Sequence, residues 1–431
     1  MEKSVKIGLL GCGTVGSGVV MLLHQNGQHI AQRLGVPVEI KMILERDREK
    51  VTALGIEPAR ITTDAETILG DSEIDIVVEV MGGIEPARTF ILEALHRGKN
   101  VVTANKDLIA LHGKELFAAA QKHGRDLYFE ASVGGGIPII LPLKQSLAAN
   151  QIHMLMGIVN GTTNYILTKM STEGRSFDEV LAEAQALGYA EADPTADVEG
   201  LDAARKLAIL ASIAFGSRVT FSDVYAEGIT RITPQDIEYG RELGYVVKLL
   251  AIGKCDNGEV EVRVHPAFIP QKHPLASVND VFNAIFIRGD FVGEIMHYGR
   301  GAGQKPTASA VVSDIMEVVR NLIHQNTGRI SCTCLEHKRI KPIGEIRSKY
   351  YIRLQVKDRP GVLAGIAGVF GNQNVSLASV IQKRTEGTMA EIVLVTHEVQ
   401  EENIQDALKI LDGMSMVGAI QNVIRVEGGE F

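Results

Sequence analysis

The chain has 431 residues, of which 45% are hydrophobic and 22% are charged, a composition typical of a globular protein with several domains. Its 52 acidic and 44 basic residues give a formal net charge of -8, which argues against a nucleic-acid-binding protein because such proteins usually carry a basic face. No apolar stretch is long enough to cross a membrane and no signal peptide precedes the first predicted strand, so we expect a cytoplasmic protein. Four cysteines are too few for a disulfide framework.

The N-terminal part of the chain alternates apolar runs with helical segments. The runs predict strands at 5–10, 38–44, 74–80, 100–103 and 126–130, and the segments between them predict helices at 14–34, 88–97 and 114–123. Such alternation predicts a mostly parallel, doubly wound sheet. We therefore expect an α/β fold that begins with a Rossmann-type domain over residues 1–133, with a late helix at 307–324 packing against it.

A glycine-rich loop follows the first predicted strand and opens the first predicted helix. It reads Gly11-Cys12-Gly13-Thr14-Val15-Gly16, which has the GxGxxG spacing. The glycines permit a tight turn and let the backbone approach a pyrophosphate, which the amides of the helix N-terminus bind. A tight turn without a ligand is the alternative, but the strand before the loop and the helix after it match the dinucleotide fingerprint. We expect NAD(P) to bind here through Gly11, Gly13, Thr14, Val15 and Gly16.

Two adjacent residues at the end of the second predicted strand bear on the choice of nucleotide. Glu45 would suit the ribose hydroxyls of NAD, whereas Arg46 would bind the extra phosphate of NADP. A solvated charged turn is a third interpretation. We expect NADP(H), with NAD(H) as the alternative.

The predicted strand at 100–103 ends in Thr103, and Lys106 follows it closely. Ligands of open α/β sheets lie outside the carboxyl ends of the strands, so we expect Thr103 and Lys106 to contact the cofactor there. Lys106 could reach a nicotinamide or a carboxylate. A plain surface lysine is the alternative, because most lysines are exposed.

The pattern of predicted helices and strands changes near residue 134, and we expect an α+β substrate and oligomerisation domain over residues 134–306. Its predicted helices are 138–149, 164–173, 178–187 and 201–215, and its predicted strands are 152–159, 260–269 and 284–291. Glu130 and the bare glycine run after it could hold a cation through oxygen ligands. An interdomain hinge explains the same glycines equally well.

The predicted helix at 201–215 carries an acid and a lysine four residues apart. Asp202 and Lys206 share one helix face, and the apolar residues around them predict a largely buried helix. A surface salt bridge is the alternative, but a desolvated lysine can exchange a proton with a carbinol oxygen. We expect most carboxylates of the acidic run from Glu191 to Asp202 to lie in a solvated loop, with Glu191 and Asp202 as the candidates for binding a substrate ammonium.

The C-terminal part contains a linker and a separate unit. Residues 328–347 are polar and irregular, and their Cys332 and Cys334 are too close for a CxxC pair, although with His337 a metal site is conceivable. Residues 348–431 follow the order βαββαβ, which predicts a ferredoxin-like domain.

Taken together and in this order, the motifs closely resemble those of the homoserine dehydrogenase family from the N-terminus to about Ala310. The motifs beyond the glycine loop are Asn105-Lys106, Glu130-Ala131-Ser132-Val133-Gly134-Gly135-Gly136-Ile137-Pro138, Asn160-Gly161-Thr162-Thr163-Asn164-Tyr165, Gly188-Tyr189-Ala190-Glu191-Ala192-Asp193-Pro194 and Gly200-Leu201-Asp202-Ala203-Ala204-Arg205-Lys206. The C-terminal unit resembles an ACT domain. No kinase-like segment precedes the first strand, so the resemblance is to the monofunctional form.

The resemblance implies reduction of L-aspartate 4-semialdehyde to L-homoserine with NAD(P)H, a step towards threonine, methionine and isoleucine. It implies that Lys206 donates the proton, that Lys106 assists near the nicotinamide, and that Glu191 and Asp202 bind the amino acid. The chemistry agrees, because hydride transfer leaves negative charge on the carbonyl oxygen that a cation or acid must meet.

The same resemblance implies further ligands. Gly188 and Gly303 would approach the nicotinamide. A sodium ion would be held by Glu130, Val133, Gly135 and Ile137, the last three through backbone carbonyls. The ACT domain would bind L-threonine as a feedback inhibitor, through Asp358, Pro360, Gly361 and Asn374. The family suggests a homodimer or homotetramer.

Two alternatives to this function remain to be weighed. Another NAD(P)-dependent amino-acid or semialdehyde dehydrogenase would share the fold, but the motifs containing Glu191 and Lys206 argue against it. A non-catalytic regulator that senses amino acids would need neither Asp202 nor Lys206, so the presence of both argues for an enzyme.

Overall fold

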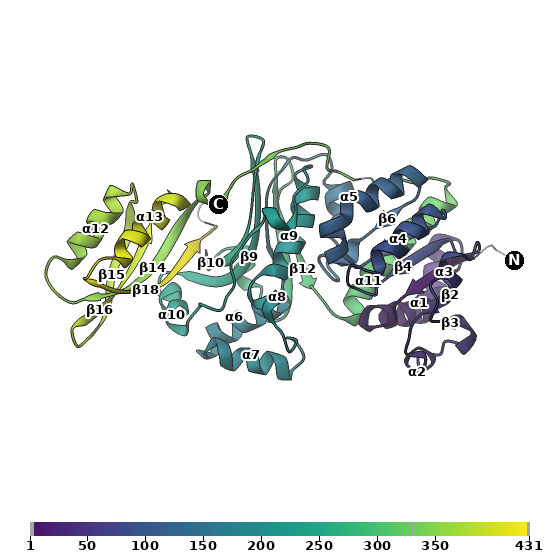
Figure 1. Ribbon diagram of the computed structural model, residues 1–431, viewed down its shortest axis with the longest axis horizontal. Coiled ribbons are helices and arrows are strands. Elements are labelled where there is room, and N and C mark those ends of the chain that lie inside the picture. The colour runs from purple at the N-terminus through teal and green to yellow at the C-terminus, as the bar shows by residue number, and fades with distance from the viewer. Residues whose placement is uncertain (1–3, 330–331, 429–431) are drawn as a thin grey trace. The chain divides into compact units, whose positions relative to one another are not determined.

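The computed structural model describes residues 4–329 and 332–428, so that residues 330–331 of the expected linker lie outside the described residues. The chain forms two compact units (Figure 1). The first consists of Met1–Leu155, Arg205–Asp223 and Asn283–His337, and the second of Met156–Ala204, Val224–Phe282 and Lys338–Phe431. None of the helices in the described ranges is long and apolar enough to cross a membrane.

A six-stranded parallel sheet lies at the centre of the first unit. Its order is β3-β2-β1-β4-β5-β6, with β1 at Val5–Leu10, β2 at Val38–Leu44, β3 at Ile61–Thr62, β4 at Ile76–Glu79, β5 at Asn100–Thr103 and β6 at Leu127–Tyr128. The chain reverses its direction of travel across the sheet between β1 and β4. That switch point is where a doubly wound sheet binds a dinucleotide, and the predicted Rossmann-type fold is confirmed.

Helices α1 (Thr14–Leu34) and α11 (Gln304–Ile323) pack against each other beside this sheet (Figure 1). Ile315 of α11 belongs to the same buried core as Ile7 and Leu9 of β1, so a segment from far along the chain completes this core. Helices α4 (Ala87–His96) and α5 (Lys106–His123) also pack together. Two short helices, α2 (Arg48–Thr52) and α3 (Glu66–Leu69), complete the set around the sheet.

Several elements of the first unit differ from their predicted bounds. Helix α5 begins eight residues earlier than expected, because the Asn105 side chain caps it by accepting a hydrogen bond from the amide of Leu108 at 3.1 Å. The predicted helix at 138–149 is shorter and has π-helical geometry over Pro142–Ser146. Strand β11 (Phe282–Gly289) was expected, but its neighbour β12 (Gly293–Arg300) was not.

The second unit contains a long hairpin and the helices around it. Strand β10 (Glu259–Pro270) pairs in antiparallel register with β9 (Tyr245–Asp256), which was not predicted. The connecting residues Asn257 and Gly258 both have positive φ, at 50° and 80°, as a two-residue hairpin turn requires. The helices are α6 (Gly161–Glu173), α7 (Phe177–Ala186), α8 (Thr195–Val198) and α10 (Pro234–Glu242), and the short strand β8 (Tyr225–Ala226) pairs with β10.

The C-terminal part of the second unit has the predicted βαββαβ order. Its elements are β14 (Arg347–Lys357), α12 (Val362–Asn372), β15 (Leu377–Glu386), β16 (Met389–Thr396), α13 (Glu401–Asp412) and β18 (Val417–Val426). The strand order β18-β14-β16-β15 confirms the ferredoxin-like fold. Strand β18 also pairs with β10, where Ala267 lies opposite Arg425 and Phe268 opposite Val426, so this domain continues the sheet of the hairpin.

Candidate active site

The glycine loop between β1 and α1 has the close packing that its sequence predicts. Gly11 has a φ of 95°, and a Cβ atom there would lie 3.1 Å from the backbone of Met81. A Cβ on Gly16 would lie 2.2 Å from the carbonyl oxygen of Gly11, so only glycine fits. A Cβ on Gly13 would meet nothing within 4 Å, and no side chain caps α1 at this residue. The first amides of α1 are therefore available to an anionic ligand.

A cavity of about 330 Å³ lies next to this loop, at the carboxyl ends of the first strands. It is lined by Gly11, Gly13, Leu44, Glu45, Arg46, Thr63, Ala65, Val80, Met81, Pro86 and Phe90. A glycine-rich floor, one carboxylate and one guanidinium are the groups that a nucleotide needs for its pyrophosphate and ribose. The residues present therefore fit a dinucleotide.

Glu45 and Arg46 have different surroundings in this cavity. The carboxylate of Glu45 accepts hydrogen bonds from the amides of Cys12 and Arg46, both at 2.8 Å. Burial alone would raise the pKa of Glu45, but these backbone bonds outweigh burial and hold it below its usual range. Arg46 is exposed. Burial, followed by the charge of Glu45, raises the pKa of Cys12 to about 11, so this thiol is a poor nucleophile.

A buried carboxylate braces the ends of β4 and β5, although no motif predicts it. Glu79 is fully buried and accepts a hydrogen bond from the Thr103 hydroxyl at 2.6 Å and another from the Met81 amide at 2.8 Å. Thr103 in turn accepts from the amide of Asn105 at 3.0 Å. This network fixes the turn from which α5 begins, with Lys106 as its first residue.

Glu130 lies at the start of the glycine run and is 3% exposed. Its carboxylate accepts hydrogen bonds from the amides of Ile139 at 2.6 Å, Ile140 at 2.8 Å and Leu141 at 2.7 Å. Burial nevertheless raises the pKa of Glu130. Because the side chain is engaged by these amides, a cation at this loop would depend on backbone carbonyls, as was expected for Val133, Gly135 and Ile137.

A second buried carboxylate, Asp314 of α11, contacts Glu130, although the two residues are 184 positions apart in the sequence. One of its oxygens accepts the backbone amide of Glu130 at 2.8 Å, and the other has no hydrogen-bond partner among the described residues. Burial, and then the charge of Glu130, raises the pKa of Asp314 well above its usual value. Two buried carboxylates with one unsatisfied oxygen are compatible with a monovalent cation nearby.

Helix α9 (Leu201–Ala214) carries the predicted acid and lysine. Asp202 is 4% exposed and Lys206 is 9% exposed. Their burial excludes the simple surface salt bridge that their spacing also allowed.

Asn160 holds the carboxylate of Asp202 within the second unit. Its side-chain amide donates to Asp202 at 2.9 Å and to Asp197 at 2.7 Å, while its carbonyl oxygen accepts from the amide of Thr163 at 2.9 Å. Asn160 therefore caps α6 and at the same time brings two carboxylates to one point. The motif containing Asn160 was recognised from the sequence, but its contact with Asp197 could not be, since they are 37 residues apart.

The remaining candidates lie on turns. Gly188 has a φ of 74° and follows α7, and the neighbouring Glu191 is exposed, with its backbone carbonyl accepting from Gln185 at 3.0 Å. In the first unit, Gly303 has a φ of 118° and precedes α11, where Gln304 donates to Ser17 of α1 at 2.9 Å. Gly303 thus lies close in the chain to a residue that touches the helix of the nucleotide loop.

The predicted effector residues lie at the two ends of one helix. Gly361 has a φ of 88° and caps the start of α12, and the backbone amide of Asp358 donates to the carbonyl of Thr388 at 2.8 Å. Asn374 has a φ of 57° and follows the end of α12. Since an 11-residue helix is about 16 Å long, one amino acid cannot touch both ends within a single chain.

Comparison with known proteins assigns all three parts of the chain. Residues 11–130 match the NAD-binding domain of homoserine dehydrogenase, residues 138–316 match homoserine dehydrogenase itself, and residues 350–413 match the ACT domain. The homoserine dehydrogenase of Synechocystis is 49% identical over 98% of this chain and 99% of its own length.

Solved structures show the same similarity. The crystal structure of a homoserine dehydrogenase from Thiobacillus denitrificans matches with a TM-score of 0.94 and 43% identity, over 99% of this chain and all of that one. A hyperthermophilic archaeal homoserine dehydrogenase in complex with NADPH matches with a TM-score of 0.63 and 28% identity, over 73% of this chain and 97% of that one.

Proposed function

This chain belongs to the homoserine dehydrogenase family, and on that premise we propose which of its residues carry out the reaction. It is an NAD(P)-dependent oxidoreductase that interconverts L-aspartate 4-semialdehyde and L-homoserine. The alternatives of a different dehydrogenase and of a non-catalytic regulator are thereby set aside.

Lys206 is the proton donor in this proposal. Bound NAD(P)H supplies the hydride, and the carbonyl oxygen of the semialdehyde then needs a proton as its negative charge develops. Lys206 is a buried cation on a rigid helix, so it can meet that oxygen without competition from bulk water. Lys106, at the first turn of α5, assists near the nicotinamide. The observation that carries the proposal is the burial of Asp202 and Lys206 four residues apart on α9.

The substrate ammonium is bound by Asp202, with Glu191 as a further acidic ligand. Support comes from the contact that Asn160 makes with both Asp202 and Asp197, which brings two carboxylates to one donor. Two carboxylates so placed attract a cationic group, and this adds Asp197 to the acids of the proposed site.

NADP(H) is the preferred cofactor in this proposal. The carboxylate of Glu45 already accepts hydrogen bonds from backbone amides, whereas Arg46 is exposed beside the cavity and can bind a 2′-phosphate. The archaeal relative in complex with NADPH supports the same choice. Gly188 and Gly303, both at positive φ, would allow the backbone to approach the nicotinamide.

A sodium ion at the loop of Glu130, Val133, Gly135 and Ile137 is also proposed. The unsatisfied oxygen of Asp314 beside Glu130 supports a cation, because a positive charge there would favour the charged form of these buried carboxyl groups. The test is the melting temperature in sodium chloride and in choline chloride of equal ionic strength. Equal melting temperatures in the two salts would contradict the proposal.

The ACT domain is proposed to bind L-threonine as a feedback inhibitor. Because Gly361 and Asn374 lie at opposite ends of α12, a site that uses Asp358, Pro360, Gly361 and Asn374 together requires two copies of the domain. This agrees with a homodimer or homotetramer as the working assembly. The test is inhibition of the full-length enzyme by L-threonine, together with its mass in solution.

The catalytic assignment is tested with Lys206→Met and with Lys122→Met, a change at an exposed position at the end of α5. We expect Lys206→Met to lower kcat for L-homoserine oxidation by about 10²- to 10⁴-fold, the range for losing a general acid or base. Its binding of NADPH, followed by fluorescence, should equal that of wild type, and Lys122→Met should keep full activity. An unchanged kcat in Lys206→Met would assign the proton transfer to another residue, whereas a wild-type protein that does not oxidise L-homoserine would contradict the function itself.

A further inference from the structure

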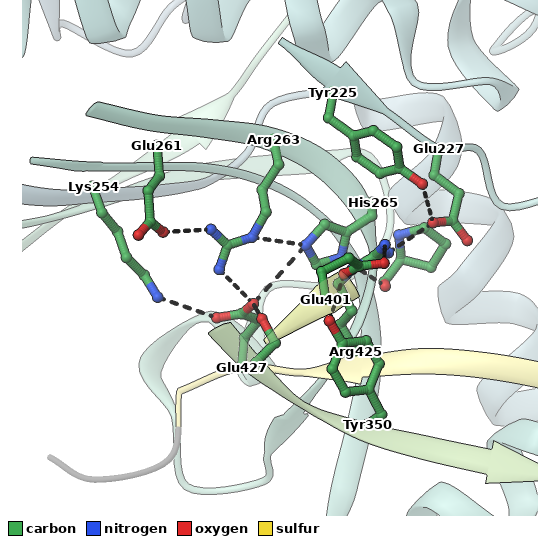
Figure 2. A network of polar contacts seen from close by, with 12 residues as sticks. Tyr225, Glu227, Lys254, Glu261, Arg263, His265, Tyr350, Glu401, Arg425 and Glu427 are labelled. Carbon is green, nitrogen blue, oxygen red and sulfur yellow. Dashed lines mark hydrogen bonds and ion pairs between the residues drawn. The ribbon is translucent and has the colours of Figure 1, made fainter. Parts of the chain in front are cut away.

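A buried ion network joins the C-terminal domain to the hairpin of the second unit (Figure 2). Arg425 of β18 is 5% exposed and donates to Glu401 of α13 through two nitrogens, at 2.7 and 2.9 Å. Its third nitrogen donates to Glu227 at 2.7 Å. Tyr350 donates to Glu401 and Tyr225 to Glu227, the latter at 3.1 Å. The guanidinium therefore holds one carboxylate from each side of the junction.

The two carboxylates that Arg425 binds belong to different parts of the second unit. Glu401 lies within the ferredoxin-like fold, and burial, which would raise its pKa, is outweighed by Arg425, so the pKa lies below its usual range and the carboxylate is charged. Glu227 is not part of that fold, because it follows β8 within residues 138–316, which match homoserine dehydrogenase. Its backbone amide donates to the carbonyl of Val264 at 2.8 Å, which anchors it to β10.

The residues directly after Glu227 touch the segment that precedes the catalytic helix. The amide of Ile229 donates to the carbonyl of Val198 at 2.8 Å, and the hydroxyl of Thr230 donates to Glu199 at 3.4 Å. A Cβ on Gly228 would lie 2.3 Å from the same Val198 oxygen, so the two backbones are in direct contact.

The segment that the 227–230 loop contacts carries the protein carboxylates that are proposed to bind the substrate. Val198 ends α8, and Asp197 in the same helix accepts from Asn160, which also holds Asp202. Gly200 caps α9 through its carbonyl, which accepts the amide of Ala204 at 2.9 Å. The contacts therefore run from Arg425 through Glu227 and the 227–230 loop to the acids proposed to bind the substrate.

We propose that Arg425 and Glu227 are positioning residues that set the placement of Asp197 and Asp202, and that the C-terminal domain acts on homoserine binding through this contact. The proposal rests on the proposed function, because it concerns the same carboxylates. It differs from a purely structural role for the network, in which loss of the contact would lower stability and leave substrate binding unchanged.

The test is Glu227→Gln in the full-length enzyme, because this side chain is 34% exposed and its loss leaves Arg425 paired with Glu401. We expect KM for L-homoserine to rise about fivefold, with kcat and KM for NADP changed by less than about twofold, the pattern of lost ground-state binding. Glu227→Asp, which keeps the charge, should lie between Glu227→Gln and wild type. L-Threonine should also inhibit Glu227→Gln less than wild type.

Glu261→Gln is the matched control. Glu261 accepts from the buried Arg263 at 2.9 Å in the same network, but it lies on β10 and not on the 227–230 loop (Figure 2). Its KM for L-homoserine should equal that of wild type. An unchanged KM in Glu227→Gln would overturn the proposal, and so would an equal rise in both variants, since that would mean only a general loosening of the hairpin.

Failure of the underlying function has a separate signature. If wild type turns over L-homoserine but L-threonine does not inhibit it, feedback by threonine is wrong and the KM comparison still decides the role of Glu227. If wild type does not turn over L-homoserine, the proposed catalytic function fails before any variant is compared, and the proposal about Glu227 falls with it.

Discussion

At the scale of single residues, one amide organises the acids of the proposed substrate site. Asn160 donates to two carboxylates and accepts at the start of α6, so its side chain must be oriented with the nitrogen towards Asp197 and Asp202. An aspartate has the same shape but offers oxygen in place of that donor. Replacing the amide would therefore set three carboxylates against one another without a hydrogen bond between them.

Asn160→Asp should weaken binding of the amino acid. Loss of hydrogen bonds to charged groups costs about 1.5–3 kcal/mol, so we expect KM for L-homoserine to rise by about 10-fold or more, with KM for NADP unchanged. Steady-state kinetics measures both, and a melting curve confirms that the variant is folded. Asn326→Asp, at an exposed position, is the control. A folded Asn160→Asp enzyme with a normal KM would show that Asn160 is not needed to place the acids.

Arg46 should decide the nucleotide preference. Arg46→Ala is expected to raise KM for NADPH about tenfold and to leave KM for NADH nearly unchanged, because only NADPH carries a 2′-phosphate for a guanidinium to bind. Kinetics with both reduced cofactors and L-aspartate 4-semialdehyde measure the ratio. Lys50→Ala, at an exposed lysine in the same segment, should change neither. An equal loss with both nucleotides would instead point to a structural role for Arg46.

The candidate site could be proposed from the sequence where its residues are close together in the chain. The glycine loop and the pair Asp202 and Lys206 each occupy a few consecutive residues, so spacing alone makes them candidates. Glu79 and Asp314 are different, because their partners are 24 and 184 residues away and nothing in their neighbourhood marks them. Their role appears only when strands β4 and β5, or α11 and the loop of Glu130, are brought together.

At the scale of elements, the strands that were not predicted differ in the strength of their sequence signal. Strand β9 lies in an apolar run, and the Asn257-Gly258 turn is a strong hairpin signal, so the sequence does contain the information that specifies this hairpin. Strand β12 was harder to predict, since its residues alternate between half-buried and exposed and none is fully buried. Helix α5 began earlier than expected because a capping asparagine, and not hydrophobic periodicity, sets its start.

Substitutions at two glycines of the loop between β1 and α1 should separate an effect on folding from an effect on cofactor binding. A Cβ on Gly16 would clash with the backbone of Gly11, so Gly16→Ala should lower the melting temperature and abolish cofactor binding. Gly13 has an ordinary φ of -69° and open space at its Cβ position, so Gly13→Ala should melt like wild type.

Both variants should nevertheless bind NADPH less tightly than wild type. Gly13→Ala places a methyl group where the pyrophosphate must approach, so NADPH binding should weaken although the fold is intact. Calorimetric titration of NADPH and a thermal melt measure the two effects. Normal NADPH binding by Gly13→Ala would show that the pyrophosphate does not lie over this loop.

At the scale of the whole molecule, the second unit depends on charges buried within it. Arg263 has no exposed surface and donates to Glu427 at 2.8 Å, beyond the end of β18. Burial alone would raise the pKa of Glu427, but Arg263 and then Lys254 outweigh it, and the pKa lies well below its usual range. The sequence predicted a separate C-terminal domain. It could not predict that this domain would neutralise a buried arginine of the hairpin 164 residues earlier.

This network predicts an acid-sensitive stability. A carboxylate with a depressed pKa stabilises the folded state fully above its unfolded pKa of 4.5 and loses that contribution as the pH falls through the folded value. We expect Glu427→Gln to melt well below wild type at about pH 7, and the gap to narrow as the pH drops below the unfolded pKa. Thermal melts across this range measure it. A gap that is independent of pH would mean that Glu427 acts by packing and not by charge.

The pairing of β10 with β18 also has a consequence for biosynthesis. Nearly 150 residues separate the two strands, so at about 5–20 residues per second the ribosome makes β10 about 7–30 seconds before its neighbour exists. Throughout that interval Ala267 and Phe268 lack their partners in β18, and Arg263 lacks the carboxylate of Glu427. We therefore expect newly made chains of this protein to need a chaperone at this stage, and chains that stop short of β18 to aggregate or be degraded.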